Sequence, residues 1–101
     1  MAAFELDFAG SAADELSALE ADAGQLRALK AVRKALGLLQ QDPNYPSLNV
    51  HPFKGTLCPH GGMLFEAYAQ NSKGGANWRI FFCYPPQARG RILIVAITPH
   101  P

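Results

Sequence analysis

Apolar and polar residues alternate at the start of the chain and then recur at helical spacing. In residues 4–8 (FELDF), apolar side chains alternate with acids, which is the period of a half-buried strand. Gly10 ends this alternation. Ser11 followed by Asp14 forms a weak capping box that predicts the start of a first helix, and Gly24 is a plausible end for it.

A second helix is predicted from about residue 25 to residue 41, because apolar residues recur there at steps of three and four. These residues are Leu29, Val32, Leu36 and Leu39. The proline after Asp42 ends the helix, since proline lacks a backbone N–H and restricts the residue before it. Residues 44–62 are rich in proline and glycine, and we interpret them as an ordered connection.

Three further strands are predicted over residues 63–70, 78–84 and 91–98, with turns between them. The resulting order is β-α-α-β-β-β. It predicts an α/β (α+β) fold in which a helical hairpin packs on one face of a small, mainly antiparallel sheet. The length of 101 residues favours one domain over residues 1–101.

Periodicity also predicts the hydrophobic core. We expect it to contain Phe4, Leu6, Phe8, Leu16, Leu19, Leu29, Val32, Leu36, Leu39, Phe65, Ile80, Phe82, Ile92, Ile94 and Val95.

Composition indicates an ordinary globular protein, with 49% hydrophobic and 17% charged residues. No secretory signal and no run of about 20 apolar residues is visible, so we expect a cytoplasmic protein. Cys58 and Cys83 are too few for a disulfide framework and favour a reducing compartment, although one bridge between them stays open. His51, Cys58 and His60 match no common zinc spacing, so no metal and no other cofactor is expected.

Charge is divided unevenly along the chain. Residues 1–50 carry four basic and seven acidic residues, whereas residues 51–101 carry five basic residues and Glu66 as their one acid. A positive field in the second half could attract a polyanion. The alternative is that charged loops only keep the sheet in solution, and charge alone does not separate the two.

Two residues on neighbouring predicted strands could carry chemistry. Alternation places Arg79 on one face with Phe81 and Cys83, where a guanidinium can bind phosphate through two hydrogen bonds. Glu66 could take a proton from a ribose hydroxyl as a general base. The simpler interpretation is that Glu66 neutralises Arg79, and the two roles are compatible.

Four further residues are candidates on weaker grounds. His100, near the chain end between two prolines, could deliver a proton to a leaving oxygen, or it could have no role. His51 could share this acid–base work. Lys54 and Lys73, in loops, could bind substrate phosphate, although loop charges are usually only solvated.

Several segments, in this order, resemble the RelE/ParE family of toxins from type II toxin–antitoxin systems. These are residues 38–48 (LLQQDPNYPSL), 51–55 (HPFKG), 65–68 (FEAY), 78–82 (WRIFF) and 97–101 (ITPHP). The resemblance covers about residues 4–101 and agrees with the predicted order of helices and strands.

This resemblance implies a metal-independent endoribonuclease that cuts mRNA, in some members on the ribosome, and so inhibits translation. Arg79 would bind the scissile phosphate and His100 would act as general acid. His51 and Lys54 lie near a loop that supplies basic groups in some members, and Glu66 lies on a strand that carries catalytic lysines in others. A cognate antitoxin protein would be the partner. The alternative is a non-catalytic, ParE-like inhibitor of a protein target such as DNA gyrase.

Overall fold

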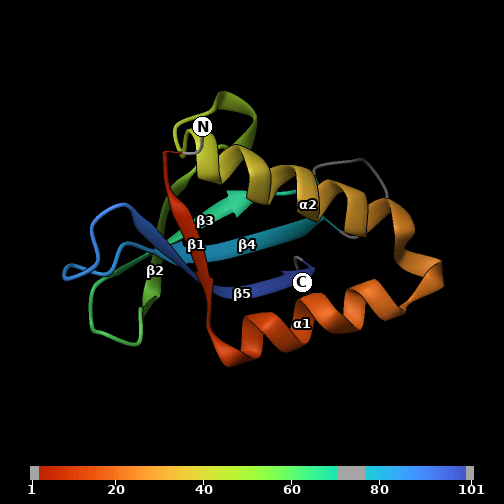
Figure 1. The fold of residues 1–101 in the computed structure, drawn as a ribbon, viewed down its shortest axis with the longest axis horizontal. Helices are drawn as coiled ribbons and strands as arrows, with labels where there is room; N and C mark the ends of the chain where they lie inside the picture. The colour runs from red at the N-terminus through yellow and green to blue at the C-terminus, as the bar shows by residue number, and fades with distance from the viewer. Residues whose placement is uncertain (1–2, 71–76, 100–101) are drawn as a thin grey trace.

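The computed structural model describes residues 3–70 and 77–99, which form two helices packed on a five-stranded sheet (Figure 1). The elements are β1 (Glu5–Phe8), α1 (Gly10–Ala21), α2 (Leu26–Gln41), β2 (His51–Leu57), β3 (Met63–Tyr68), β4 (Trp78–Cys83) and β5 (Arg91–Pro99). Short 3₁₀ turns at Ala23–Gln25 and Pro46–Leu48 follow α1 and α2. The predicted helical hairpin on a sheet is confirmed.

The sheet is mixed, with strand order β1-β5-β4-β3-β2. β1 pairs with β5 in parallel, and the other three neighbouring pairs are antiparallel. The predicted order of elements was wrong at one place, because residues 51–57 form the edge strand β2 within the expected connection. Pro52 and Gly55 are unusual in central strands but are tolerated at an edge, where only one side needs partners. The pairing of β2 with β3 is irregular between Pro52 and Leu57.

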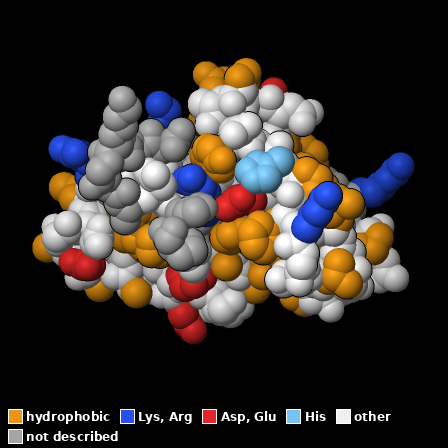
Figure 2. Space-filling view, turned by 180° about the vertical axis from the view of Figure 1, so that it is seen from behind, with side chains coloured by type: hydrophobic (Ala, Val, Ile, Leu, Met, Phe, Trp, Pro, Cys, Tyr) orange, Lys and Arg blue, Asp and Glu red, His pale blue; other side chains and the backbone are white. Residues whose placement is uncertain are grey.

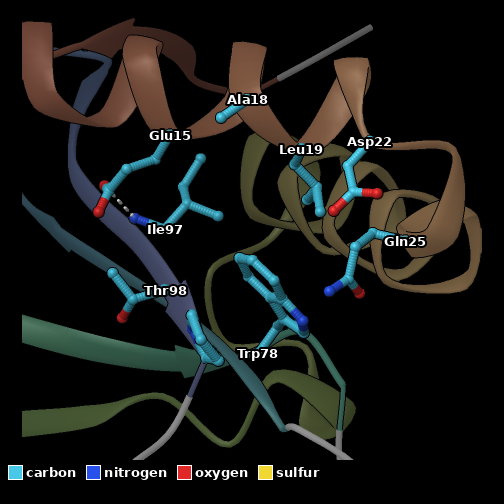
Figure 3. Close-up of a pocket in the computed structure, with 9 residues that line it drawn as sticks. Glu15, Ala18, Leu19, Asp22, Gln25, Trp78, Ile97 and Thr98 are labelled. Carbon is cyan, nitrogen blue, oxygen red and sulfur yellow. Dashed lines mark hydrogen bonds between the residues drawn. The ribbon is translucent and has the colours of Figure 1, made fainter.

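α1 covers the part of β5 that extends beyond the short strand β1. The Ser11 hydroxyl donates to the Val95 carbonyl at 3.0 Å, and the Glu15 carboxylate accepts from the Ile97 N–H at 2.9 Å (Figure 3). The predicted capping box is therefore wrong: Ala9 is the N-cap of α1, without a side-chain cap. Helix side chains here satisfy strand groups that would otherwise lie at an unpaired sheet edge.

The core lies between the helices and one face of the sheet. α2 contributes the predicted stripe, and Ile80, Phe82, Ile92 and Ile94 of the sheet are fully buried. Two predicted core residues are wrong. Phe8 is 38% exposed, and Val95 lies at a register shift that lets Ile94 and Ile97 face the core instead.

An ion cluster joins the two parallel strands β1 and β5. Arg91 donates two hydrogen bonds of 2.7 Å to Asp7 and one of 2.6 Å to Glu5. The Arg91 guanidinium holds the pKa of Asp7 below its usual range, and the two acids hold the pKa of Arg91 above its own. A bidentate pair of this kind fixes the position of β1 along β5.

The two cysteines are joined in a disulfide, and their Cα atoms lie 6.3 Å apart. The two cysteines favoured a reducing compartment in the sequence, and the single bridge that the sequence left open is the arrangement found. Although β3 separates β2 from β4 in the sheet, the turn after β2 brings Cys58 across to Cys83 at the end of β4. Among the described residues, no helix has the length and apolar character of a membrane span.

Candidate functional site

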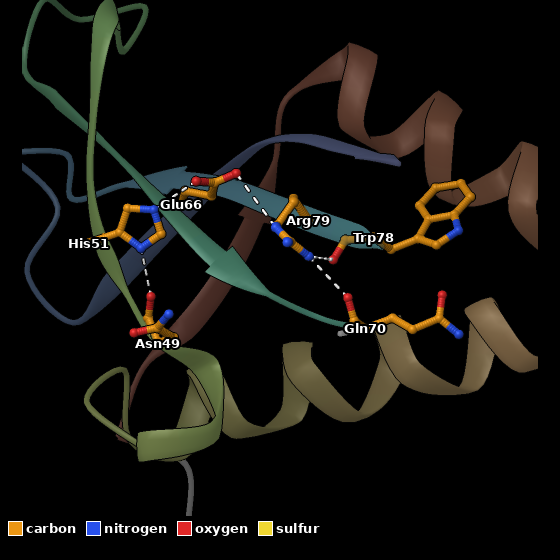
Figure 4. Close-up of polar contacts among 6 residues, drawn as sticks. All are labelled: Asn49, His51, Glu66, Gln70, Trp78 and Arg79. Atoms are coloured by element: carbon orange, nitrogen blue, oxygen red, sulfur yellow. Dashed lines mark hydrogen bonds and ion pairs between the residues drawn. The ribbon is translucent and has the colours of Figure 1, made fainter. Parts of the chain in front are cut away.

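Four side chains from three neighbouring strands meet on the sheet face that the helices leave open. The strand register pairs His51 with Glu66, Glu66 with Phe81, and Tyr68 with Arg79, so these residues share one face. Figure 2 shows this side of the molecule, where histidine, acidic and basic side chains gather among hydrophobic ones. Figure 4 shows how His51, Glu66 and Arg79 point toward one another.

Glu66 is the centre of this group. Its Oε1 lies 2.7 Å from His51 Nε2, and its Oε2 lies 3.7 Å from Arg79 Nε (Figure 4). The Glu66 side chain is only 10% exposed, whereas that of His51 is 39% exposed. The Glu66 carboxylate therefore lies between the buried guanidinium of Arg79 and the imidazole of His51, and solvent can reach the imidazole.

The hydrogen bonds of His51 fix how many protons the pair with Glu66 holds. His51 Nδ1 lies 2.7 Å from the Asn49 carbonyl oxygen, which can only accept, so Nδ1 carries a proton. Nε2 and Glu66 Oε1, at 2.7 Å, also need a proton between them, since two facing lone pairs would repel. The pair thus holds one shared proton, either as imidazolium with carboxylate or as neutral imidazole with carboxylic acid.

Arg79 is buried, with 6% of its surface exposed. Its Nη1 donates to the carbonyls of Gln70 at 3.0 Å and Trp78 at 3.3 Å, and its guanidinium carbon lies 3.8 Å from the centroid of the Tyr68 ring. Among the described residues, Arg79 Nε is buried without a hydrogen-bond partner. These contacts hold the positive charge of Arg79 beside Glu66, while the Nε–H of Arg79 makes no hydrogen bond with the described part of the chain.

The predicted site residues have different outcomes. The structure brings Arg79, Glu66 and His51 together, and it confirms that Glu66 lies against Arg79. Lys54 is exposed on β2, three residues beyond His51. His100 and Lys73 lie outside the described residues.

Sequence reasoning missed two groups that shape this site. Tyr68 stacks on Arg79 and also meets the His51 ring edge-on, with centroids 5.7 Å apart. Asn49 adopts a left-handed backbone conformation with φ of 47°, and its carbonyl oxygen accepts the hydrogen bond from His51. Asparagine tolerates this region better than most residues, so the asparagine before β2 was a usable signal.

A hollow of about 250 Å³ lies between α1 and the end of β5 (Figure 3). Its walls include Leu19, Trp78 and Ile97, and its polar groups include Glu15 and Asp22. Glu15 already accepts from the Ile97 N–H, and Asp22 from the Gly24 N–H. Both acids serve the fold, so this hollow offers less for proton transfer than the open sheet face.

Comparisons with protein-family models, with curated proteins and with solved structures found no match for this chain. The resemblance to RelE/ParE toxins rests on the sequence segments described above.

Proposed function

We propose that this chain is a RelE/ParE-like toxin that cleaves mRNA in the cytoplasm as a metal-independent endoribonuclease. The observation that carries the proposal is the pairing of a solvent-reachable His51 with a nearly buried Glu66 at 2.7 Å, above the Arg79 charge. Such a pair can both accept and donate a proton. The partners in this proposal are mRNA, on or off the ribosome, and a cognate antitoxin protein.

The shared proton allows one pair to serve both halves of an RNA cleavage. Glu66, through the tenth of its side chain that stays exposed, takes the proton of the ribose 2′-hydroxyl as that oxygen attacks the adjacent phosphorus. The bond from phosphorus to the 5′-oxygen breaks, and His51 gives its Nε2 proton to that leaving oxygen. The products are a 2′,3′-cyclic phosphate and a 5′-hydroxyl.

After this step the pair is a neutral imidazole beside a carboxylic acid, with the same total of protons as before. Transfer along the hydrogen bond between Glu66 and His51 restores the starting state without any proton from outside. Both groups are side chains of the protein, so the reaction as written draws on no metal. The positive charge of Arg79 stabilises the negative charge that develops on the phosphorane.

The test is cleavage of a short RNA by purified protein in the presence of EDTA, with detection of the cyclic phosphate. Glu66→Gln and His51→Gln should each lower the rate by about 10²–10⁴-fold, the usual contribution of general acid–base catalysis. Arg89→Ala, which removes an exposed positive charge in the turn before β5, is the matched control and should leave the rate unchanged.

His51→Gln is the decisive variant, because it leaves the pairing of Glu66 with Arg79 in place and should keep the fold. Lys54→Ala separates binding from chemistry, since loss of a phosphate contact should raise KM and leave kcat unchanged. Full activity of His51→Gln, or equal cleavage of an RNA whose 2′-hydroxyls are replaced by hydrogen, contradicts the proposal.

One observation favours the second candidate, a non-catalytic ParE-like inhibitor of a protein such as DNA gyrase. Arg79 is 6% exposed and bonded to two carbonyls, so it is poorly placed to bind a phosphate directly. Under this alternative, induced expression stops growth while mRNA stays intact, and His51→Gln remains toxic. Inhibition of supercoiling by the purified protein would identify the target class.

A further inference from the structure

We propose that Cys58, His60 and Cys83 form a zinc-binding site when the protein is reduced. The two sulfurs and one imidazole nitrogen all lie within 4.8 Å of one another. The cysteines are buried and His60 is exposed, so two thiolates would line the inner side of the ion and the imidazole would close the outer side. The inference concerns a cluster apart from Glu66 and His51 and does not rest on the proposed nuclease activity.

The turn between β2 and β3 holds two of the three groups in place. The Cys58 N–H donates to the Gly62 carbonyl at 2.9 Å, and the Gly61 N–H donates to the Cys58 carbonyl at 2.7 Å. Gly61 has φ of 92°, which favours glycine. A Cβ at Gly62 would lie 2.5 Å from His60 Nε2, so glycine is what allows the ring to fold back over the turn.

The third ligand comes from β4, which explains why spacing along the chain did not predict a metal. Cys83 lies 25 residues after Cys58 in sequence, yet their Cα atoms are 6.3 Å apart. Along the chain, Cys58 and His60 group with His51, but His51 instead bonds to Glu66. The expectation of no metal followed from that grouping, and the proposal replaces it.

The donor set suits zinc. Two thiolates and one imidazole are the ligands that Zn²⁺ prefers, and three protein ligands leave a fourth position for a solvent molecule. With Zn–S bonds of about 2.3 Å and tetrahedral angles, the two sulfurs would stand ~3.8 Å apart. Reduction of the disulfide separates the sulfurs to roughly this distance, because two unbonded sulfurs cannot approach much closer.

The proposed cytoplasmic location and the access of solvent also favour this use of the cysteines. In a reducing cytoplasm a disulfide is rare, and a pair of buried neighbouring thiols is more often a metal site. His60 also lines a surface pocket of about 470 Å³ with Gly62, Met63 and Tyr84, so its ring can be reached from solvent. Binding releases the protons of the two thiols, since thiolates are the ligands.

The test is titration of the intact, reduced protein with Zn²⁺ against a chromogenic chelator, without oxygen. We expect one Zn²⁺ per chain. Cys58→Ser and His60→Ala should each weaken binding by more than about 100-fold, because even changes outside the ligand shell cost 10–100-fold. Lys30→Ala, which removes an exposed cation from α2, is the control and should bind as the wild type does. Protein oxidised to the disulfide should not bind.

A second measurement identifies the ligands. Co²⁺ or Cd²⁺ in place of Zn²⁺ should give a sulfur-to-metal charge-transfer band, which Cys58→Ser reduces and His60→Ala shifts. If the reduced protein is unfolded without metal, Zn²⁺ should restore its circular dichroism spectrum. The proposal is overturned if the reduced wild type binds no Zn²⁺ or stays unfolded in its presence, or if Cys58→Ser and His60→Ala bind Zn²⁺ as tightly as the wild type does.

Discussion

Replacing Glu66 with leucine removes the carboxylate that faces the buried Arg79 guanidinium. At 3.7 Å, two unit charges attract by about 4.5 kcal/mol at an effective dielectric constant of 20. Removing one partner of a buried pair generally costs 3–5 kcal/mol, because the other charge stays buried. Arg79 keeps its carbonyl partners Gln70 and Trp78 and its stacking on Tyr68, so we expect a loss of about 3 kcal/mol, at the low end of that range.

The assay is urea unfolding at pH 7 of the disulfide-bonded protein, followed by circular dichroism. A loss of this size should also lower Tm by roughly 12–24 °C for a domain of this length. Arg79→Met in the Glu66→Leu background is the informative partner, since it removes the unpaired charge and keeps an apolar stem over Tyr68. The double variant should recover most of the lost stability, because replacing both members of a buried pair is often neutral.

His51→Gln is the matched control, since the imidazole side chain is 39% exposed and an exposed ion pair contributes at most about 1 kcal/mol. A cost below ~1 kcal/mol for Glu66→Leu would contradict a stranded charge at Arg79, because that is the cost of losing an exposed pair. If the double variant is as unstable as Glu66→Leu alone, the loss reflects packing around Glu66 rather than the stranded charge of Arg79.

Three further predictions concern stability. Because Arg91 holds the pKa of Asp7 low, the pair stabilises the fold above the ordinary carboxyl pKa of about 3.9, and this stabilisation is lost as pH falls through the lower folded pKa. The wild type should therefore have a higher Tm than Asp7→Asn at pH 7, and this difference in Tm should vanish in thermal unfolding at acid pH. Leu39→Ala, at a fully buried position of α2, should cost about 2–5 kcal/mol in urea unfolding, and Leu39→Met, which keeps the volume, less than about 1.5. Reducing the Cys58–Cys83 bridge with EDTA present should cost about 3.5 kcal/mol for a loop of this length, and the same reductant should not change the melting of a Cys58→Ser/Cys83→Ser variant.

The sequence predicted those parts of the fold in which apolar side chains recur at a regular spacing. The stripe of α2 is strictly amphipathic, and Ile80 and Phe82 alternate with Arg79 and Phe81, so both elements and their buried faces were predictable. The same alternation placed Arg79 near Glu66, because the strands on either side of a turn pair in antiparallel fashion.

The features that the sequence did not predict depend on contacts between distant segments. Ser11 was interpreted as a helix cap, yet its hydroxyl bonds to Val95, 84 residues away. The shift in register near Val95 turned that side chain from the core, and Ile97 took its place. Neither local propensity nor periodicity contains information about which strand edge a helix will cover.

β2 shows why the missed strand matters for function. No residue of β2 is buried, so little apolar area holds it to the sheet. What holds it, apart from its irregular ladder with β3, is a row of side-chain contacts on the open face: His51 to Glu66, Phe53 to Phe81 with ring centroids 4.9 Å apart, and the bridge beyond its end. Two of these three contacts, those of His51 and Cys58, come from residues of the two proposed sites. A polar sequence with proline and glycine could become a strand here because those side chains make contacts that β propensity does not measure.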